Sequence, residues 1–245
     1  MWKNFITRPD WSDVYPFEMF TAQHLVPLLL LIGFILLLYG SRRQLQAPFP
    51  DKLVRFGLGG LLIGMETILY VWYIQTDYFT WSQSLPLQLC SLSYILTILI
   101  LLFPNRRLYE FLYFAGIGGA IQAIVTPVAI LSGFPHFTYF YFFIGHAAIV
   151  WVALYMTWVH HFRPTFGSIW RVLLYLNILL VAVVLPANLI TGGNYFFIAR
   201  KPAGDSLLNV LGDWPWYILS LEGVAILMFL LLYVPFLKIP PRRKG

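Results

Sequence analysis

Seven long apolar segments constrain the fold of this chain more than any other feature of the sequence. They cover residues 25–39, 53–74, 85–103, 108–131, 137–159, 168–190 and 216–237. Only 11% of the residues are charged, whereas soluble domains carry about 25%. Apolar runs of this length match the hydrocarbon core of a bilayer, where helices satisfy the backbone polar groups internally. The sequence therefore predicts an all-α, polytopic membrane protein, a bundle of seven transmembrane helices.

The apolar segments follow one another without a soluble domain between them, so we expect one helical domain over residues 1–245. The net charge of +6 does not indicate nucleic-acid binding, because the basic residues stand in short clusters between the apolar segments. Membrane lipids are therefore the expected partners. A single cysteine excludes an intramolecular disulfide and a multi-cysteine metal site. The sequence predicts no metal and no cofactor.

Basic residues alternate between the two ends of the predicted helices. The second and fourth connections, residues 75–84 and 132–136, contain no Lys or Arg, and the sixth balances Arg200 and Lys201 with Asp205 and Asp213. Positively charged loops stay in the cytoplasm, so we expect the N-terminus outside and the C-terminus inside. His160 and His161 are interpreted as solvated interface residues. The basic residues of the other connections and the tail are Arg42, Arg43, Lys52, Arg55, Arg106, Arg107, Arg163, Arg171, Lys238, Arg242, Arg243 and Lys244.

Polar side chains recur at one depth of the predicted bundle. At 1.5 Å per residue, those within the helices lie about 8–13 Å below the outer end, and two others lie slightly higher. Such groups are costly in a bilayer, so they tend to face a wet cavity or one another. We therefore expect a polar cavity open to the outer leaflet; the alternative is that these groups only join helices. They are Cys90, His146, Glu66, Gln88, Gln122, Asn188 and Glu222.

The thiol and the imidazole of this layer are the residue types of a nucleophile and its base. A thiol attacks as its thiolate, and a neighbouring histidine can accept its proton, which makes Cys90 and His146 the catalytic candidates. Acyl transfer also needs a group that orients the base and donors for the oxyanion. Glu66 or Glu222 would orient the imidazole, and a glutamine of the layer would donate. The opposing interpretation is two unrelated buried side chains, since buried cysteines are commonly inert.

Several short strings resemble a known family and follow its order along nearly the whole chain. LPLQLCSLSYIL is followed by YEFLYFAGIGGAIQAIVTP, FPHFTYFYFFIGH and NYFFIARKPAGDSLLNVLGDWPWYI. Together they resemble the YwaF-like bacterial integral membrane proteins, which are related to the eukaryotic transmembrane protein 164 group. The resemblance implies a multi-pass protein of the cell membrane, in a bacterium the cytoplasmic membrane.

The same resemblance implies a function. The eukaryotic group is linked to phospholipid acyl transfer, with a cysteine and a histidine as the proposed catalytic pair. Those residues correspond to Cys90 in PLQLCSLS and His146 in FFIGHAA. Relatives commonly carry Asp at the position of Ser91, which puts the charge balance of the site in question. The resemblance thus points to a phospholipid acyltransferase that uses a Cys/His pair.

Two other functions fit the same residues. In a lipid-binding or transport protein without catalysis, the polar layer would hold a head group. A zinc-dependent membrane lipid hydrolase would use histidines and carboxylates near the outer side, although no compact HxxxH spacing supports it. Its candidate ligands would be His24, His136, His146, Glu66 and Glu222.

Overall fold

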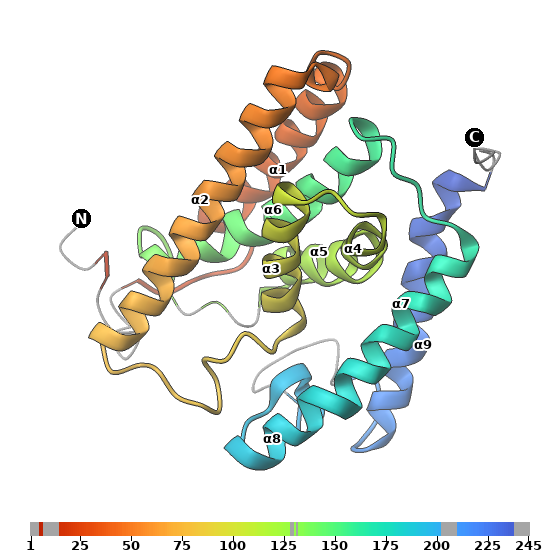
Figure 1. Cartoon of the computed structure of the whole chain (residues 1–245). Helices are drawn as coiled ribbons and strands as arrows, with labels where there is room; N and C mark the ends of the chain where they lie inside the picture. The colour runs from red at the N-terminus through yellow and green to blue at the C-terminus, as the bar shows by residue number, and fades with distance from the viewer. Residues whose placement is uncertain (1–4, 7–14, 128–129, 131, 202–209, 238–245) are drawn as a thin grey trace.

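The computed structural model of the chain consists of helices joined by short connections (Figure 1). It describes residues 5–6, 15–127, 130, 132–201 and 210–237. The α-helices are α1 (Ala22–Ser41), α2 (Pro48–Gln75), α3 (Leu89–Leu102), α4 (Arg106–Phe111), α5 (Ile117–Val125), α6 (Phe137–Trp158), α7 (Phe166–Leu179), α8 (Leu185–Thr191) and α9 (Trp216–Tyr233). Shorter helical turns are η2 (Gln44–Gln46), η3 (Leu112–Gly116), η4 (Leu180–Val184), η5 (Tyr195–Phe197) and η7 (Val234–Phe236).

The described residues confirm the predicted all-α membrane class. Two π-helical turns join shorter pieces into continuous rods: η3 links α4 to α5, and η4 links α7 to α8. Within the described part of the chain, six helices are long and apolar enough to cross a membrane. The seventh predicted segment is the shorter apolar helix α3, of 14 residues. Each predicted segment therefore corresponds to one helix or rod.

Two predicted segments are shorter in the structure than in the sequence analysis, and proline explains both differences. The segment expected from residue 85 becomes helical only at Leu89: Pro86 disfavours helix at Leu85, and Gln88 is an extended N-cap (φ −72°, ψ 151°). The segment expected to reach residue 131 ends at Val125, where Thr126 is non-helical (φ −130°, ψ 74°) ahead of Pro127. Residues 128–129 and 131 lie outside the described residues.

Successive helices alternate in direction, so their connections gather at two ends. At one end, Asp51 at the start of α2 accepts hydrogen bonds from Tyr155 and His160 at the end of α6, both at 2.7 Å. Arg55 of α2 donates to the carbonyl of Leu101 at the end of α3. His160 is therefore half-buried and hydrogen-bonded to Asp51, and its interpretation as a solvated residue was wrong. It pairs with Asp51 because both side chains lie where α2 and α6 meet.

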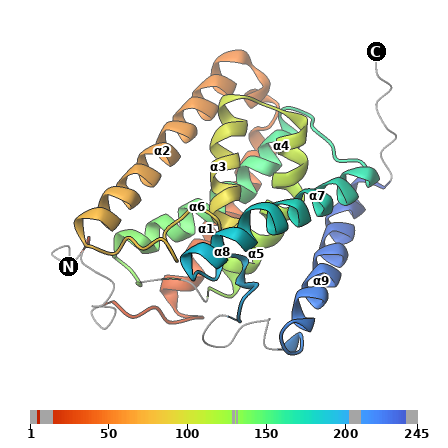
Figure 2. The same cartoon turned by 60° about the horizontal axis from the view of Figure 1, so that its bottom comes forward.

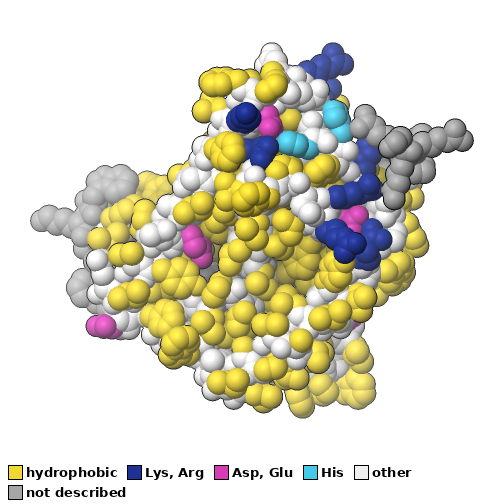
Figure 3. All heavy atoms as spheres, viewed as in Figure 1, with side chains coloured by type: hydrophobic (Ala, Val, Ile, Leu, Met, Phe, Trp, Pro, Cys, Tyr) yellow, Lys and Arg dark blue, Asp and Glu magenta, His cyan; other side chains and the backbone are white. Residues whose placement is uncertain are grey.

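The basic connections α1–α2, α3–α4 and α6–α7 share this end, as the sequence pattern requires of one membrane side. Figure 3 shows the Lys and Arg side chains of the visible face gathered over one part of the molecule. The opposite end carries the α2–α3, α5–α6 and α8–α9 connections; Asp205 of the last lies outside the described residues. Which end faces the cytoplasm stays a prediction from the charges.

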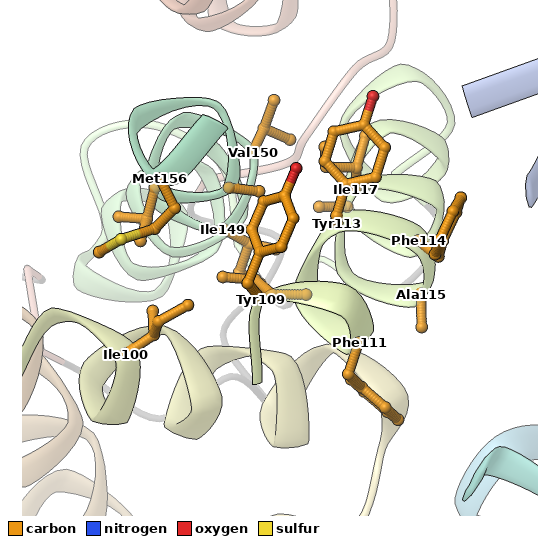
Figure 4. Packing of buried hydrophobic residues seen from close by; sticks show 14 of the residues in the cluster. Ile100, Tyr109, Phe111, Tyr113, Phe114, Ala115, Ile117, Ile149, Val150 and Met156 are labelled. Atoms are coloured by element: carbon orange, nitrogen blue, oxygen red, sulfur yellow. The ribbon is translucent and has the colours of Figure 1, made fainter. Parts of the chain in front are cut away.

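The core lies where α3, the α4–η3–α5 rod and α6 meet (Figure 4). Tyr109 stands in its middle with no exposed surface and shares a 2.9 Å hydrogen bond with Thr157. Ile100 and Ile149 approach it from α3 and α6. This packing fixes α3 against α6, and these two helices carry the predicted thiol and imidazole.

Candidate active site

Cys90 lies in the first turn of α3, which begins at Leu89 with Gln88 as its N-cap. The first amide groups of a helix have no carbonyl partner within it, and they form the positive end of the helix dipole. The backbone N–H groups around Cys90 are therefore placed to stabilise negative charge near the sulfur. Gly119 of α5 packs beside this turn: a Cβ there would lie 3.3 Å from Leu89 and 3.9 Å from the Cys90 Sγ.

His146 lies in the middle of α6, and its imidazole is held in one tautomer. Its Nδ1 lies 2.7 Å from the backbone carbonyl of Phe142, and the two rings are 4.4 Å apart between centroids. A carbonyl oxygen can only accept, so Nδ1 carries the proton and Nε2 keeps a lone pair. The Phe142 carbonyl thus orients the imidazole, the role that was predicted for Glu66 or Glu222. Nε2 remains free to act as a base.

Both side chains line one small cavity of about 50 Å³ between α3 and α6. Gly145 contributes to its wall because α3 comes too close for a larger residue: a Cβ there would lie 2.9 Å from the ring of Tyr94. Among the described residues, no hydrogen bond joins the thiol to the imidazole in this state. The lining residues are Cys90, Ser91, Tyr94, Tyr141, Gly145, His146 and Ile149.

Glu66 does not line this cavity but contacts Tyr141, which does. The Tyr141 hydroxyl donates to Glu66 Oε2 at 2.6 Å. The Tyr141 ring stacks on Tyr94, whose hydroxyl donates to the carbonyl of Leu62. Both tyrosines of the wall are therefore fixed at their polar ends by α2. Glu66 positions the wall of the cavity and makes no hydrogen bond to His146.

Gln88 and Asn188 both hydrogen-bond the backbone at the start of the α8–α9 connection. Gln88 Oε1 accepts from the backbone N–H of Phe196 at 2.9 Å. The Asn188 amide makes two bonds to the backbone of Tyr195, accepting from its N–H at 2.7 Å and donating to its carbonyl at 3.0 Å. These bonds hold the start of the α8–α9 connection against α3 and α8, and neither side chain lines the small cavity.

The two remaining residues of the predicted layer do not line the small cavity either. Glu222 of α9 accepts a 2.9 Å hydrogen bond from Asn177 and so joins α9 to α7. Gln122 lies on the exposed side of α5. Of the seven predicted site residues, only Cys90 and His146 line the small cavity.

The histidines that a zinc site would need make structural contacts instead. His24 accepts from the N–H of Phe20 at 3.1 Å and, through Nε2, bonds the carbonyl of Ile124 at 2.8 Å. His136 caps α6 by accepting from the N–H of Thr138. Within the described ranges, no three His, Cys, Asp or Glu side chains converge to hold a metal ion. The geometry of these residues does not favour the zinc hydrolase alternative.

Comparison with known proteins places the chain in a family. A family model described as the TMEM164 family matches residues 19–233. The chain belongs to the TMEM164 family. This confirms the predicted relation to the transmembrane protein 164 group, while the YwaF-like label stays a prediction. A search of the curated proteins and a search of the solved structures each found no match.

As a member of the TMEM164 family with several membrane-crossing helices, the chain is a multi-pass integral membrane protein. The matched region contains both catalytic candidates. Ser91, where the resemblance leads one to expect Asp, lines the cavity itself, so this departure lies within the site. The backbone amide groups beside Cys90 were not predicted; Pro86, which disfavours helix at Leu85, is the sequence signal for a later start of α3.

Proposed function

We propose that this TMEM164-family protein is a thiol-dependent phospholipid acyltransferase, with Cys90 as nucleophile and His146 as general base. The observation that carries the proposal is that both residues line one cavity, with Cys90 in the first turn of α3. The imidazole is already held with Nε2 unprotonated, which is the form that can accept the thiol proton. The charge pattern further supports a location of this site in the outer half of the bilayer.

The first half-reaction forms a thioester. The Cys90 proton passes to His146 Nε2 as the sulfur attacks the carbonyl carbon of a phospholipid ester. The S–C bond forms and the negative charge moves to the carbonyl oxygen, where amide groups of the first turn of α3 can donate hydrogen bonds. The C–O bond then breaks, and the departing lysophospholipid oxygen takes the proton from His146. Ionisation of the thiol is unfavourable in apolar surroundings, so transfer of its proton accompanies the attack.

The second half-reaction reverses these roles. The hydroxyl of an acceptor lysophospholipid gives its proton to His146 Nε2, and its oxygen attacks the thioester carbon. The C–S bond breaks, and the imidazolium returns the proton to the sulfur. An acyl chain has moved from one glycerol oxygen to another, with no oxidant or other reactant consumed. A cavity of about 50 Å³ holds little more than the ester group, so entry of a substrate must displace part of its wall.

The test uses the purified full-length chain in lipid vesicles that contain a phospholipid with an isotopically labelled acyl chain and an unlabelled lysophospholipid. We expect the label to appear in the acceptor, measured by mass spectrometry of the lipids. His146→Gln should slow this transfer by about 100–10,000-fold, the usual contribution of a general base. His160→Gln, just beyond the C-terminal end of α6, is the control that should retain transfer. Transfer by His146→Gln at the wild-type rate would contradict the assigned role.

A further inference from the structure

A second and much larger cavity lies along the other side of α6. It is a groove of about 1,470 Å³ between α1, α2 and α6. Its walls are formed almost entirely by aliphatic and aromatic side chains from all three helices. They include Leu30 and Phe34 of α1, Leu53 and Gly57 of α2, and Ala147 and Trp151 of α6.

The groove is separate from the cavity at Cys90. Ile144, Ala147 and Trp151 line the groove, and they recur every three or four residues along one side of α6. Gly145 and His146 line the small cavity from the opposite side of the same helix. Because α6 stands between them, a molecule in the groove does not touch the thiol.

The groove exists because α1 and α2 diverge after their short connection (Figure 2). Along its length α1 packs on α6, as Trp151 shows by donating to the carbonyl of Phe34, whereas α2 packs mainly on α3. Over their described lengths, α1 and α2 make no extended contact with each other. The groove between α1 and α2 is therefore open laterally, toward the surrounding lipid.

The composition of the walls favours a lipid chain over another helix. Both α1 and α2 are long and apolar enough to cross a membrane, so lipid hydrocarbon is the medium that surrounds the groove. Close packing of a partner helix uses strips of Gly, Ala, Ser and Thr. Most side chains of the groove are large, with Leu30, Phe34 and Leu53 among them, and its few Gly and Ala residues are spread over three helices instead of forming one strip. An irregular apolar surface of this kind suits a flexible acyl chain.

The charges at one end of the groove indicate which head group would accompany the chain. Lys52 of α2 directly precedes Leu53, the first groove residue of that helix, and Arg43 lies in the connection between α1 and α2. Both are exposed, and neither forms an ion pair with a carboxylate of the described residues. Asp51, the nearby acid, is already satisfied by Arg55 and His160. This end therefore carries positive charge that a phosphate could neutralise.

We propose that the groove binds an anionic phospholipid of the surrounding membrane. Its acyl chain lies between α1, α2 and α6, and its phosphate contacts Arg43 and Lys52. This site rests on the groove and its charges and is independent of the function proposed for Cys90.

The test compares two glycine variants of α2 by native mass spectrometry of the delipidated full-length protein. Added palmitoyl-oleoyl phosphatidylglycerol should be retained by the wild type and largely lost from Gly57→Phe, whose ring fills the groove. Gly60→Phe is the matched control, because that position is equally open but does not line the groove. Replacing Arg43 and Lys52 with Gln should weaken phosphatidylglycerol binding about fivefold per charge and leave phosphatidylcholine binding unchanged.

Three results would overturn the proposal. One is equal retention of phosphatidylglycerol by Gly57→Phe and the wild type. Another is equal retention of phosphatidylglycerol and phosphatidylcholine by the wild type, which would indicate lipid bound to the protein surface without head-group selectivity. The third is a dimer that dissociates in Gly57→Phe without loss of lipid, which would assign the groove to a second copy. Should Gly57→Phe fail to fold, Ala147→Leu narrows the same groove from α6 and takes its place.

Discussion

Cys90→Ser should lose acyl transfer by at least about 1,000-fold, because a serine hydroxyl at this site is a far weaker nucleophile than a thiol paired with an imidazole. The sulfur lies in the first turn of α3 and shares its cavity with His146, so the change removes the reacting atom and little else. The measurement is the rate at which labelled acyl chains move from phospholipid to lysophospholipid in vesicles that contain the purified protein.

The comparison needs variants that are folded. Thr67→Ala changes another small polar side chain, on the exposed side of α2, and should transfer acyl chains at the wild-type rate. Thermal unfolding in detergent should show Cys90→Ser within a few degrees of the wild type. If this folded variant keeps full activity, the thiol takes no part in the reaction.

Arg171→Met should be the most destabilising single substitution among the ion pairs of the described residues, by about 3–5 kcal/mol. Arg171 donates to both oxygens of Glu110 at 2.9–3.1 Å, and the Glu110 side chain is only 5% exposed. Arg106, the other cation near that carboxylate, lies at 3.8 Å. Removing Arg171 would leave a buried charge without its close partner, which costs more than the pair itself contributes.

Glu110→Gln supplies the matched comparison for this pair. This change removes the carboxylate that pairs with Arg171. Because the Arg171 side chain is 43% exposed, water can solvate its charge, and we expect the free energy of unfolding to fall by only about 1 kcal/mol. The free energy of unfolding, from denaturant titration of the purified protein in detergent, should therefore fall much further for Arg171→Met. Equal losses for the two variants would show that desolvation of Glu110 does not govern this interface.

The number and direction of the helices follow directly from the sequence, because a bilayer admits few alternatives to apolar helices that alternate in direction. Counting residues from the loops predicted Cys90 and His146 at similar depth, and both side chains line the small cavity. Depth, however, gives one coordinate of three. Glu222 and Gln122 were predicted at the same depth, but neither lines the small cavity.

Other parts of the site depend on contacts that no spacing reveals. The tautomer of His146 is set by the Phe142 carbonyl, and Glu66 acts on the cavity through Tyr141. The groove beside α1 could not be foreseen, since its shape comes from the angle between α1 and α2 after their connection.

A covalent intermediate is the most direct measure of the central claim. Cys90 is the only cysteine of the chain, so the mass of the intact protein reports on one thiol. After incubation with phospholipid and rapid quenching, we expect a mass increase of one acyl group on Cys90. Hydroxylamine, which cleaves thioesters, should remove it, and it should be absent from Cys90→Ser. Acyl transfer that proceeds in full while the intact mass never changes, or an acyl group located on another residue, would contradict the mechanism.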